Sequence, residues 1–360
     1  MRLGRLVILP AVALLFAILL PAGPAGAQSA YITNLHDNSV SVVDTTSNTV
    51  TATIAVGHNP QGIAVAPNGG KAYVADFLCS AVSVIDTTSN AVTATIPVGA
   101  DPHGIAITPD SATVYVASSG PGTVSVITTS TNTVATTISV GHFPEGVAVS
   151  PDGTKAYVTN GFDNTVSVID TGSNTVTGTI AVGNFPIGVA FGPNGTTAYV
   201  ANNGDDTVSV IDVATATQTA AIPVGTSPVG IAVAPNGSAA YVANNSDNTV
   251  SVIALPSNTV TATVPTGTGF RGPIGVSVTP DSSTAYVAGE GLNKVYAISA
   301  ASNTVVATIS VGSGPAAFGA FIGPAPKPPI PVPSFSAWAE ILFGALLLAA
   351  GGCRLRRRAA

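Results

Sequence analysis

Four histidines and one glutamate are the side chains best suited to acid–base or metal chemistry in this chain. The histidines are His36, His58, His103 and His142, and the glutamate is Glu145. An imidazole beside a carboxylate can transfer a proton, and several such groups together could hold zinc or copper. The histidines lack the close spacing of a local metal motif. Long-range folding must therefore bring them together if they act jointly.

A tyrosine that recurs at an almost constant interval indicates what positions these residues. The tyrosines are Tyr31, Tyr73, Tyr115, Tyr157, Tyr199, Tyr241 and Tyr286, with five steps of 42 residues and a last step of 45. A period of this length is typical of a repeat architecture. Within each unit, Val, Ile and Ala alternate with Thr and Ser. This alternation predicts short β-strands.

Four short strands in each unit, repeated seven times, predict an all-β, seven-bladed β-propeller over residues 28–323. We label the strands of a unit A to D from the channel axis outward, and expect one set near residues 63–65, 73, 82–85 and 92–98. The first unit opens at Tyr31 on a B strand, whereas residues 315–322 have the pattern of an A strand. This C-terminal A strand should join the N-terminal B, C and D strands, which closes the ring without an exposed edge.

Three segments of the unit resemble the YVTN family of β-propeller repeats. They are AYVTN at 156–160, NTVSVID at 164–170 and PDG at 151–153. The resemblance covers residues 30–323 and implies a propeller like those of surface-layer and other exported proteins of bacteria and archaea. Related propellers include lactonases, oxidoreductases, DNA-binding proteins and scaffolds, so the resemblance implies a fold more than an activity.

The loops of the expected propeller divide into a uniform set and a variable set. The A–B and C–D turns repeat the same Pro, Asp, Asn and Gly residues, which turn formation explains; we call this end the turn face. The D–A and B–C loops share the opposite end, the loop rim, where the units differ. The loop rim holds all four histidines, Cys79, Phe77, Phe143, Phe162, Phe185, Glu145, Glu290 and a three-residue insertion near Arg271. Because propeller ligands usually bind at a channel mouth, the loop rim is the candidate binding face.

The residue after each D–A proline should face the channel axis. These residues are Gln61, His103, Glu145, Ile187, Val229, Ile274 and Ala316. Three neighbouring polar positions are thus followed by four apolar ones. One interpretation is a one-sided pocket whose ligand-binding residues are Gln61, His103, Glu145, His58, His142 and Arg271. The other interpretation is ordinary variation among solvated loops.

Metal and cofactor sites are not predicted. A zinc or copper site from His, His and Glu would draw its ligands from separate blades. A calcium site in the loop of Asp205 and Asp206 lacks the spacing of a known calcium loop, and turn formation explains these residues. The chain also lacks a nucleophile elbow, a P-loop, a haem-attachment pair and a zinc-protease helix. The sequence therefore gives no direct sign of catalysis.

The charge balance excludes nucleic acid as a partner. The formal net charge of the chain is −6. Between residues 28 and 324, sixteen acidic side chains stand against four basic ones, Lys71, Lys155, Arg271 and Lys294. A nucleic-acid-binding surface needs a basic stripe that neutralises phosphates, and this segment has none.

Residues 1–27 are typical of a secretory signal peptide. Arg2 and Arg5 precede an apolar run over residues 6–20, and Ala25-Gly26-Ala27 forms a small-residue cleavage site. This order of a basic start, an apolar centre and small residues matches a signal peptide. The alternative is a retained membrane anchor.

The C-terminal residues predict a second localisation signal. Residues 324–333 form a stiff Pro-rich linker and begin a sorting motif. Residues 334–353 continue that motif into a short apolar segment, which is at the lower length limit for a transmembrane helix. Residues 354–360 form a basic tail that should remain cytoplasmic. Cys79 and Cys353 should then lie on opposite sides of the membrane, so no disulfide is expected.

The beginning of this apolar segment resembles the IPTL-type C-terminal sorting signal. The residues that correspond are Val332, Pro333, Ser334, Phe335, Ser336 and Trp338, whereas Ala337 replaces the acidic residue of the family pattern. The resemblance implies an exported Gram-negative protein that is held in the inner membrane. It also implies processing by an exosortase-like enzyme and release to the cell surface.

Two functions are compatible with the sequence. The first is an exported, monomeric, non-catalytic binding or structural module whose loop rim contacts a surface protein or glycan. The second is a propeller enzyme of the lactonase or oxidoreductase kind that uses His103 and Glu145 at the channel mouth. Convergence of the polar side chains on one point favours the enzyme, and histidines turned to solvent favour the binding module.

Overall fold

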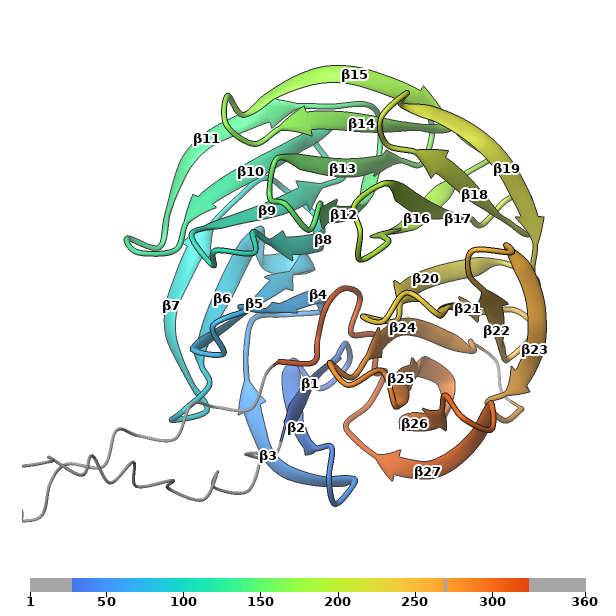
Figure 1. Ribbon diagram of the computed structural model, residues 1–360. Coiled ribbons are helices and arrows are strands. Elements are labelled where there is room, and N and C mark those ends of the chain that lie inside the picture. The colour runs from blue at the N-terminus through green and yellow to red at the C-terminus, as the bar shows by residue number, and fades with distance from the viewer. Residues whose placement is uncertain (1–27, 269–270, 324–360) are drawn as a thin grey trace, which may run out of the picture.

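The chain forms an all-β, seven-bladed propeller. The computed structural model describes residues 28–268 and 271–323 of the 360. In this part, 27 strands form six four-stranded sheets and one three-stranded sheet. The sheets stand around a central channel (Figure 1). The fold predicted from the tyrosine period is therefore confirmed.

The strands of each blade run from the channel axis outward in chain order. The A strands are β4 (Pro60–Val65), β8 (Pro102–Ile107), β12 (Pro144–Val149), β16 (Pro186–Phe191), β20 (Pro228–Val233) and β24 (Pro273–Val278). The B strands are β1 (Ser29–Asn34), β5 (Lys71–Asp76), β9 (Thr113–Ser118), β13 (Lys155–Asn160), β17 (Thr197–Asn202), β21 (Ala239–Asn244) and β25 (Thr284–Gly289).

The two outer layers are equally regular. The C strands are β2 (Ser39–Asp44), β6 (Ala81–Asp86), β10 (Thr123–Thr128), β14 (Thr165–Asp170), β18 (Thr207–Asp212), β22 (Thr249–Ala254) and β26 (Lys294–Ser299). The D strands are β3 (Thr49–Ala55), β7 (Ala91–Pro97), β11 (Thr133–Ser139), β15 (Thr175–Ala181), β19 (Thr217–Pro223), β23 (Thr259–Pro265) and β27 (Thr304–Ser310). Two B–C loops contain single 3₁₀ turns, η1 (Phe77–Cys79) and η2 (Glu290–Leu292).

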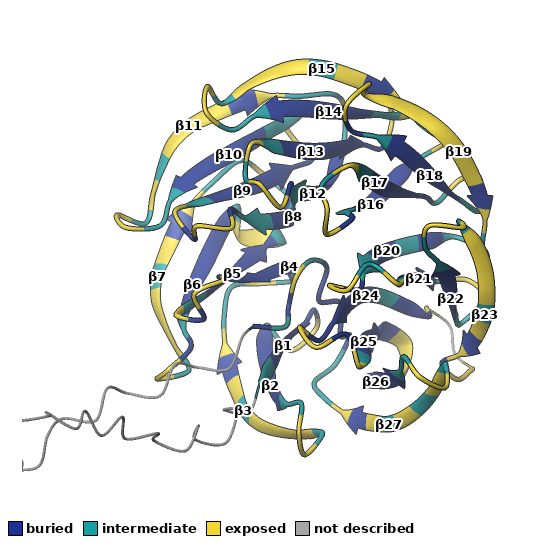
Figure 2. Cartoon of the chain, viewed as in Figure 1, coloured by how far each residue is buried: buried dark blue, intermediate teal, exposed yellow. Residues whose placement is uncertain are grey.

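The apolar core lies between blades rather than within them. One cluster joins Tyr73 and Val84 of one blade to Ile105 and Val116 of the next, and equivalent clusters recur around the ring. The B and C strands are buried on both faces, whereas the D strands are mostly exposed, with one buried residue near the end of each strand (Figure 2). Blade-to-blade burial therefore stabilises the ring, because each sheet alone would leave both faces open.

The A strands approach one another closely at the axis. A Cβ added to Gly104 on β8 would lie 2.3 Å from the carbonyl oxygen of Glu145 on β12. The same addition at Gly62 on β4 would lie 2.1 Å from the carbonyl oxygen of His103. Since real Cβ atoms do not come this close to a backbone oxygen, glycine is required here. This close approach brings the residues beside each glycine to the channel mouth.

Three of the repeated tyrosines, Tyr31, Tyr115 and Tyr286, bond to the turn face of the next blade. The Tyr115 hydroxyl donates to Oδ1 of Asn174 at 2.7 Å, and Tyr286 does so to Asn48 at 2.7 Å. Burial raises the pKa of Tyr115 to about 12, so the hydroxyl remains a donor at neutral pH. The hydroxyls of Tyr73 and Tyr157 are buried without a partner. Ala216 stands where the equivalent C–D turns carry Asn, and nothing in the structure explains this substitution.

The C-terminal segment closes the ring, as predicted, but it is not a regular strand. It pairs with β1 through the isolated bridges Ala30–Ile322 and Asn34–Pro315. It also bonds to the next blade, where the Ile63 amide donates to the Phe318 carbonyl at 3.0 Å. Residues at positive φ, Gly314 and Gly319, bend this segment between its two neighbours. Backbone hydrogen bonds on both sides therefore seal the ring.

The predicted signal peptide, linker, sorting motif, apolar segment and basic tail (1–27, 324–333, 334–353 and 354–360) lie outside the described residues. Among the residues that are described, no helix has the length and apolar character needed to cross a bilayer.

Candidate functional site

The loop rim brings His103 and Glu145 together at the channel axis. The two residues follow Pro102 and Pro144 at the start of the neighbouring strands β8 and β12. His103 Nδ1 lies 2.9 Å from Glu145 Oε2, which is ion-pair distance. The sequence-based expectation that these positions face the axis side by side agrees with this geometry.

The His103–Glu145 pair is largely closed off from solvent. The exposed fractions of the two side chains are 19% and 9%. The His103 ring packs against Phe318, with centroids 5.4 Å apart, and against the edge of Phe77 at 6.4 Å. Burial alone would lower the pKa of His103, but the Glu145 carboxylate outweighs burial and the pKa lies above its ordinary value. The pair therefore favours a protonated imidazole packed between aromatic rings.

The other three residues expected to join this pair on nearby loops interact elsewhere. The Gln61 amide donates to Asn59 Oδ1 at 2.7 Å within its own loop. His142 Nδ1 lies 2.8 Å from Asp163 Oδ1, with the imidazole 84% exposed. His58 is exposed, and its backbone amide donates to Cys79 Sγ at 3.1 Å. The structure thus brings together two of the predicted ligand-binding residues rather than five.

Arg271, the sixth candidate, forms an ion pair of its own. Its guanidinium contacts the buried carboxylate of Glu290 in the adjacent B–C loop. Both residues belong to the blade of β24–β27, whereas His103 and Glu145 belong to the blades of β8 and β12. Arg271 therefore anchors its own loop.

Carboxylates of the loop rim mainly accept backbone amides. Asp205 Oδ2 accepts the Asn184 amide at 2.6 Å, and Asp206 Oδ1 accepts the Ser227 amide at 2.8 Å. These bonds explain why the loop carries two acidic residues. Within residues 28–268 and 271–323, no group of three or more His, Cys, Asp or Glu side chains is placed to hold a metal ion.

Asp76 is a buried exception among these carboxylates. It is 0% exposed and accepts a 2.6 Å hydrogen bond from the Ser83 hydroxyl, while its Oδ1 has no partner. Four other blades carry Asn at this position: Asn34, Asn160, Asn202 and Asn244. Burial raises the pKa of Asp76 to about 6. A carboxylate here is therefore less favourable than the amide of the repeat.

Three phenylalanines form an aromatic cluster on the loop rim, in which Phe162 is exposed and Phe143 and Phe185 are half-buried. Phe143 and Phe162 stack with centroids 4.4 Å apart and ring planes 14° apart. Phe185 of the next blade lies 6.0 Å from Phe143 and 5.8 Å from Phe162. Phe162 is 65% exposed. The sequence places these residues on the rim, but their association depends on the relative position of two blades.

The backbone beneath this aromatic cluster is unfavourable for phenylalanine. Phe143 has a φ of 55° and Phe185 a φ of 49°. The equivalent residues before the D–A prolines of three other blades are Asn59, Asp101 and Ser227, which also have positive φ. Asn and Asp tolerate this left-handed conformation, whereas a bulky side chain is a genuine outlier there. Two adjacent blades therefore hold an aromatic residue where the repeat favours a small polar one.

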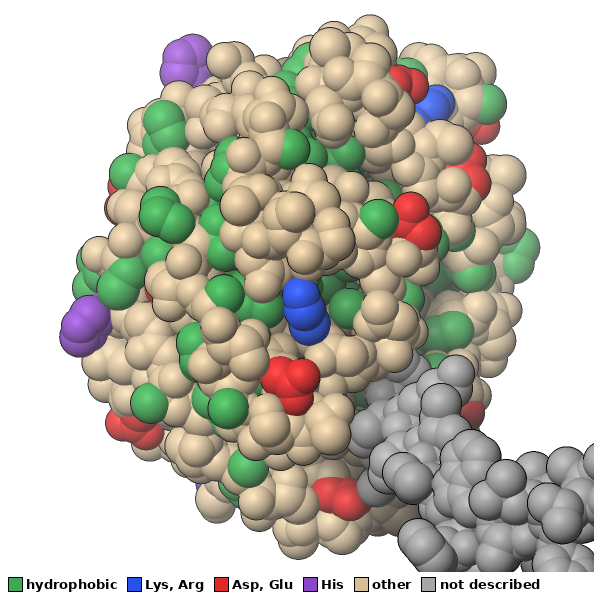
Figure 3. All heavy atoms as spheres, turned by 90° about the vertical axis from the view of Figure 1, so that its left-hand side faces the viewer, with side chains coloured by type: hydrophobic (Ala, Val, Ile, Leu, Met, Phe, Trp, Pro, Cys, Tyr) green, Lys and Arg blue, Asp and Glu red, His purple; other side chains and the backbone are tan. Residues whose placement is uncertain are grey.

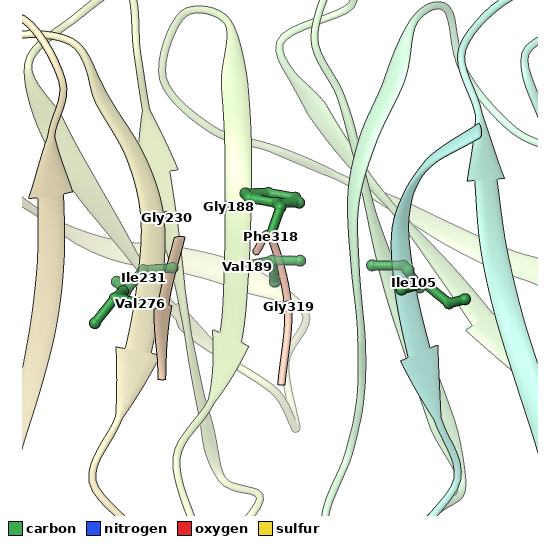
Figure 4. A pocket seen from close by; sticks show the side chains of 9 residues that line it. Ile105, Gly188, Val189, Gly230, Ile231, Val276, Phe318 and Gly319 are labelled. Carbon is green, nitrogen blue, oxygen red and sulfur yellow. The ribbon is translucent and has the colours of Figure 1, made fainter. Parts of the chain in front are cut away.

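Phe318 is a channel residue that the sequence pattern did not single out. Its ring lies in the middle of the channel, near Gly188 and Val189 (Figure 4). Between this ring and the surrounding A strands the channel keeps a hollow of about 30 Å³. Phe318 follows a bend in the closing segment, so the alternation of a regular strand does not predict its direction.

Comparison with known proteins places the fold in a known family. The sequence model described as "Lactonase, 7-bladed beta-propeller" matches residues 28–259 and, in an overlapping match, residues 188–318. No curated protein matches the chain.

Solved structures show the same fold. The chain is similar to hydrazine synthase of Kuenenia stuttgartiensis, at 22% identity and a TM-score of 0.67, over 74% of this chain and 90% of that one. It is also similar to a functionally unknown protein from Desulfotomaculum acetoxidans DSM 771, at 18% identity and a TM-score of 0.71, over 82% of this chain and 100% of that one. At these identities the likeness concerns the fold alone.

Proposed function

The chain belongs to the lactonase family of seven-bladed β-propellers, and we propose that it is an exported member that binds a surface partner through its loop rim. The aromatic cluster of Phe143, Phe162 and Phe185 carries this proposal. Exposed aromatic side chains are the typical anchors of binding surfaces. This proposal makes the chain a binding module rather than a catalyst.

The conformation of the cluster supports a binding role over chance exposure. A residue in a sparsely populated backbone region costs roughly 1–3 kcal/mol and tends to occur at functional sites. Phe143 and Phe185 both adopt positive φ, and they contact each other across two blades. Small polar residues occupy the same backbone elsewhere in the ring, so the fold itself does not require phenylalanine.

The surroundings of the cluster suit a neutral or polar partner. His142 Nδ1 and Asp163 Oδ1 form a neighbouring polar pair at 2.8 Å, with the imidazole exposed. Figure 3 shows the outer side of the ring, at the left in Figure 1, where acidic side chains are scattered among neutral ones and no basic cluster is visible. A surface protein or a glycan fits this combination of aromatic rings and hydrogen-bonding groups, whereas a nucleic acid does not.

Binding to the cell envelope tests this function. We expect purified protein to bind isolated envelope of the producing bacterium, and Phe162→Ser to reduce that binding at least tenfold. Protease treatment of the envelope abolishes binding if the partner is a protein, and periodate oxidation abolishes it if the partner is a glycan. Leu78→Ser is the matched control, because Leu78 is 68% exposed on another B–C loop. Equal binding by Phe162→Ser and the wild type would contradict the proposal.

Export and anchoring form the second part of the proposed function. The signal-peptide pattern of residues 1–27 and the sorting pattern of residues 332–338 support an inner-membrane protein whose propeller lies outside the cytoplasm. The resemblance to YVTN repeats, which occur in exported proteins, supports the same location. Processing by an exosortase-like enzyme would release the propeller to the cell surface.

Replacing the sorting residues tests this part independently. We expect Pro333→Ala with Trp338→Ala to leave the propeller folded but to stop its processing, detected as a longer membrane-bound form on immunoblots of cell fractions. Pro328→Ala, in the linker, should have no effect. Processing that is unchanged in the double variant would reduce the C-terminal segment to a simple anchor.

A lactonase-like or oxidoreductase-like enzyme is the second candidate function. Family membership and the 2.9 Å contact between His103 and Glu145 favour it. The pair could act as an acid and its orienting carboxylate, although Phe318 and Phe77 cover the imidazole. Lactone hydrolysis by purified protein that disappears in His103→Gln, while Phe162→Ser retains it, would establish this candidate instead.

A further inference from the structure

The central channel opens on the turn face into an apolar cavity of about 460 Å³. The A strands and residues 319–322 line it, and their alanines leave this room: Ala64, Ala106, Ala148, Ala190, Ala232 and Ala320. Ser277 is the one residue with a polar side chain among the described lining residues. Both the size and the apolar walls are those of small-molecule pockets.

Phe318 closes the inner end of this cavity. Toward the loop rim the channel narrows to the 30 Å³ hollow, and Ile105, Val189 and Ile231 line both spaces. The Phe318 ring stands at the narrow end (Figure 4) and packs against His103 on its far side. The cavity is therefore reached from the turn face and is separate from the partner-binding loop rim.

Three of the A–B turns at this end of the channel carry an aspartate. The A–B turns that encircle the cavity carry Asp110, Asp152 and Asp281. Each accepts a hydrogen bond from a neighbouring hydroxyl, as from Ser150 to Asp152 at 2.6 Å. Side-chain hydrogen bonds of this kind hold the pKa of each of the three carboxyls below its ordinary value. All three are therefore ionised at neutral pH.

The rest of the turn face adds to this negative charge. The C–D turns carry Asp44, Asp86, Asp170 and Asp212. The basic side chains on the described part of this face are Lys71 and Lys155, and Lys71 Nζ donates to the Thr129 carbonyl at 2.9 Å. A low-dielectric cavity bordered by charge of one sign concentrates the potential and attracts ions of the opposite sign.

We propose that this cavity binds a small organic cation with an apolar body, such as a hydrophobic amine or a quaternary ammonium ion. The apolar body displaces water from the aliphatic walls. The positive group remains hydrated at the entrance, among the carboxylates of the A–B turns. Neither the lactonase-family match nor the loop rim bears on this site, so it stands independently of the proposed function.

Calorimetric titration with three probes tests charge and apolar character together. We expect decyltrimethylammonium, used below its micelle concentration, to bind at least tenfold more tightly than decyl sulfate or tetramethylammonium at low salt. The preference over decyl sulfate should shrink as salt screens the aspartates. Equal binding of decyl sulfate would overturn the proposal of a cation site, and failure of decyltrimethylammonium to bind would overturn the cavity as well.

Two variants locate the binding. Ala148→Phe fills the cavity and should weaken decyltrimethylammonium binding at least tenfold, whereas Ala91→Phe on the exposed strand β7 should not. The triple variant Asp110→Asn, Asp152→Asn, Asp281→Asn retains the turns, since other A–B turns carry Asn68, Asn194 and Asn236. It should weaken binding of the cation severalfold and strengthen that of decyl sulfate. An unchanged affinity for decyltrimethylammonium in Ala148→Phe, or in the triple aspartate variant, would contradict the proposal.

Discussion

The turn face and the loop rim are built from the same seven repeats, but they depart from the repeat in different ways. On the turn face, three of the buried tyrosines bond to the turn of the next blade, as Tyr115 does to Asn174. On the loop rim, Phe143 and Phe185 adopt positive φ and Asp76 is a buried acid. The repeated residues of the turn face therefore serve stability, and the costly exceptions of the loop rim indicate function.

The largest expected effect concerns Asp76, the least favourable exception on the loop rim. Its pKa is raised from 3.8 to about 6, so the folded state disfavours the ionised form. The penalty is absent well below the unfolded pKa, grows as pH rises from the unfolded to the folded value, and is complete above the folded value. We expect Asp76→Asn, the residue of four other blades, to raise the free energy of unfolding by about 3 kcal/mol at pH 8.

Urea unfolding of the wild type and Asp76→Asn at pH 8 and pH 4 measures this effect. The gain should largely disappear at pH 4, where the wild-type carboxyl is protonated in the folded state and the pH lies close to its unfolded pKa. An equal gain at both pH values would mean that burial of charge is not the reason for it.

The next largest effect concerns the A strands, which line the channel between the turn face and the loop rim. Gly104→Ala places a Cβ 2.3 Å from the Glu145 carbonyl oxygen. We expect a loss of about 2 kcal/mol in the free energy of unfolding, from overpacking against backbone. Gly178→Ala on strand β15 is the control, because nothing lies within 4 Å of its added Cβ, and it should be neutral or stabilising. Equal effects at the two glycines would mean that the A strands can separate freely.

A smaller effect on stability concerns the turn face, at the C–D turn residue Ala216. Ala216 has a φ of 53°, and the Tyr157 hydroxyl lacks a partner. Asn at this position should accept that hydroxyl and also favour the left-handed backbone. We expect Ala216→Asn to raise the free energy of unfolding by about 1 kcal/mol. Asn174→Ala, which breaks the bond to Tyr115, should lower it by a similar amount; a destabilising Ala216→Asn would contradict the role of the tyrosines.

Most of the fold follows from the sequence because each unit repeats the same local signals. The tyrosine period predicts the number of blades, and the A-strand pattern of residues 315–322 predicts the ring closure. The adjacency of His103 and Glu145 also follows, since residues at equivalent positions of neighbouring blades meet at the axis. Local chemistry and the global fold agree at these positions.

Contacts that depend on loop direction do not follow from the sequence. The Phe143–Phe162–Phe185 cluster forms because two D–A loops and one B–C loop converge, and no periodicity encodes that convergence. Phe318 points into the channel because the closing segment bends near Gly314 and Gly319. Arg271 and Glu290 pair across an insertion that interrupts the repeat. Where the repeat is interrupted, tertiary contacts and not the local sequence pattern determine where a side chain points.

The most direct test of the account measures stability and binding in the same variant. Phe143→Asp with Phe185→Asn restores the small polar residues that other blades carry at this backbone conformation. The account predicts a free energy of unfolding about 1 kcal/mol higher than that of the wild type, because relief of backbone strain exceeds the lost ring contacts. It also predicts at least tenfold weaker binding to the cell envelope. Envelope binding that is undiminished in this more stable variant would contradict the assignment of the loop rim as the binding surface.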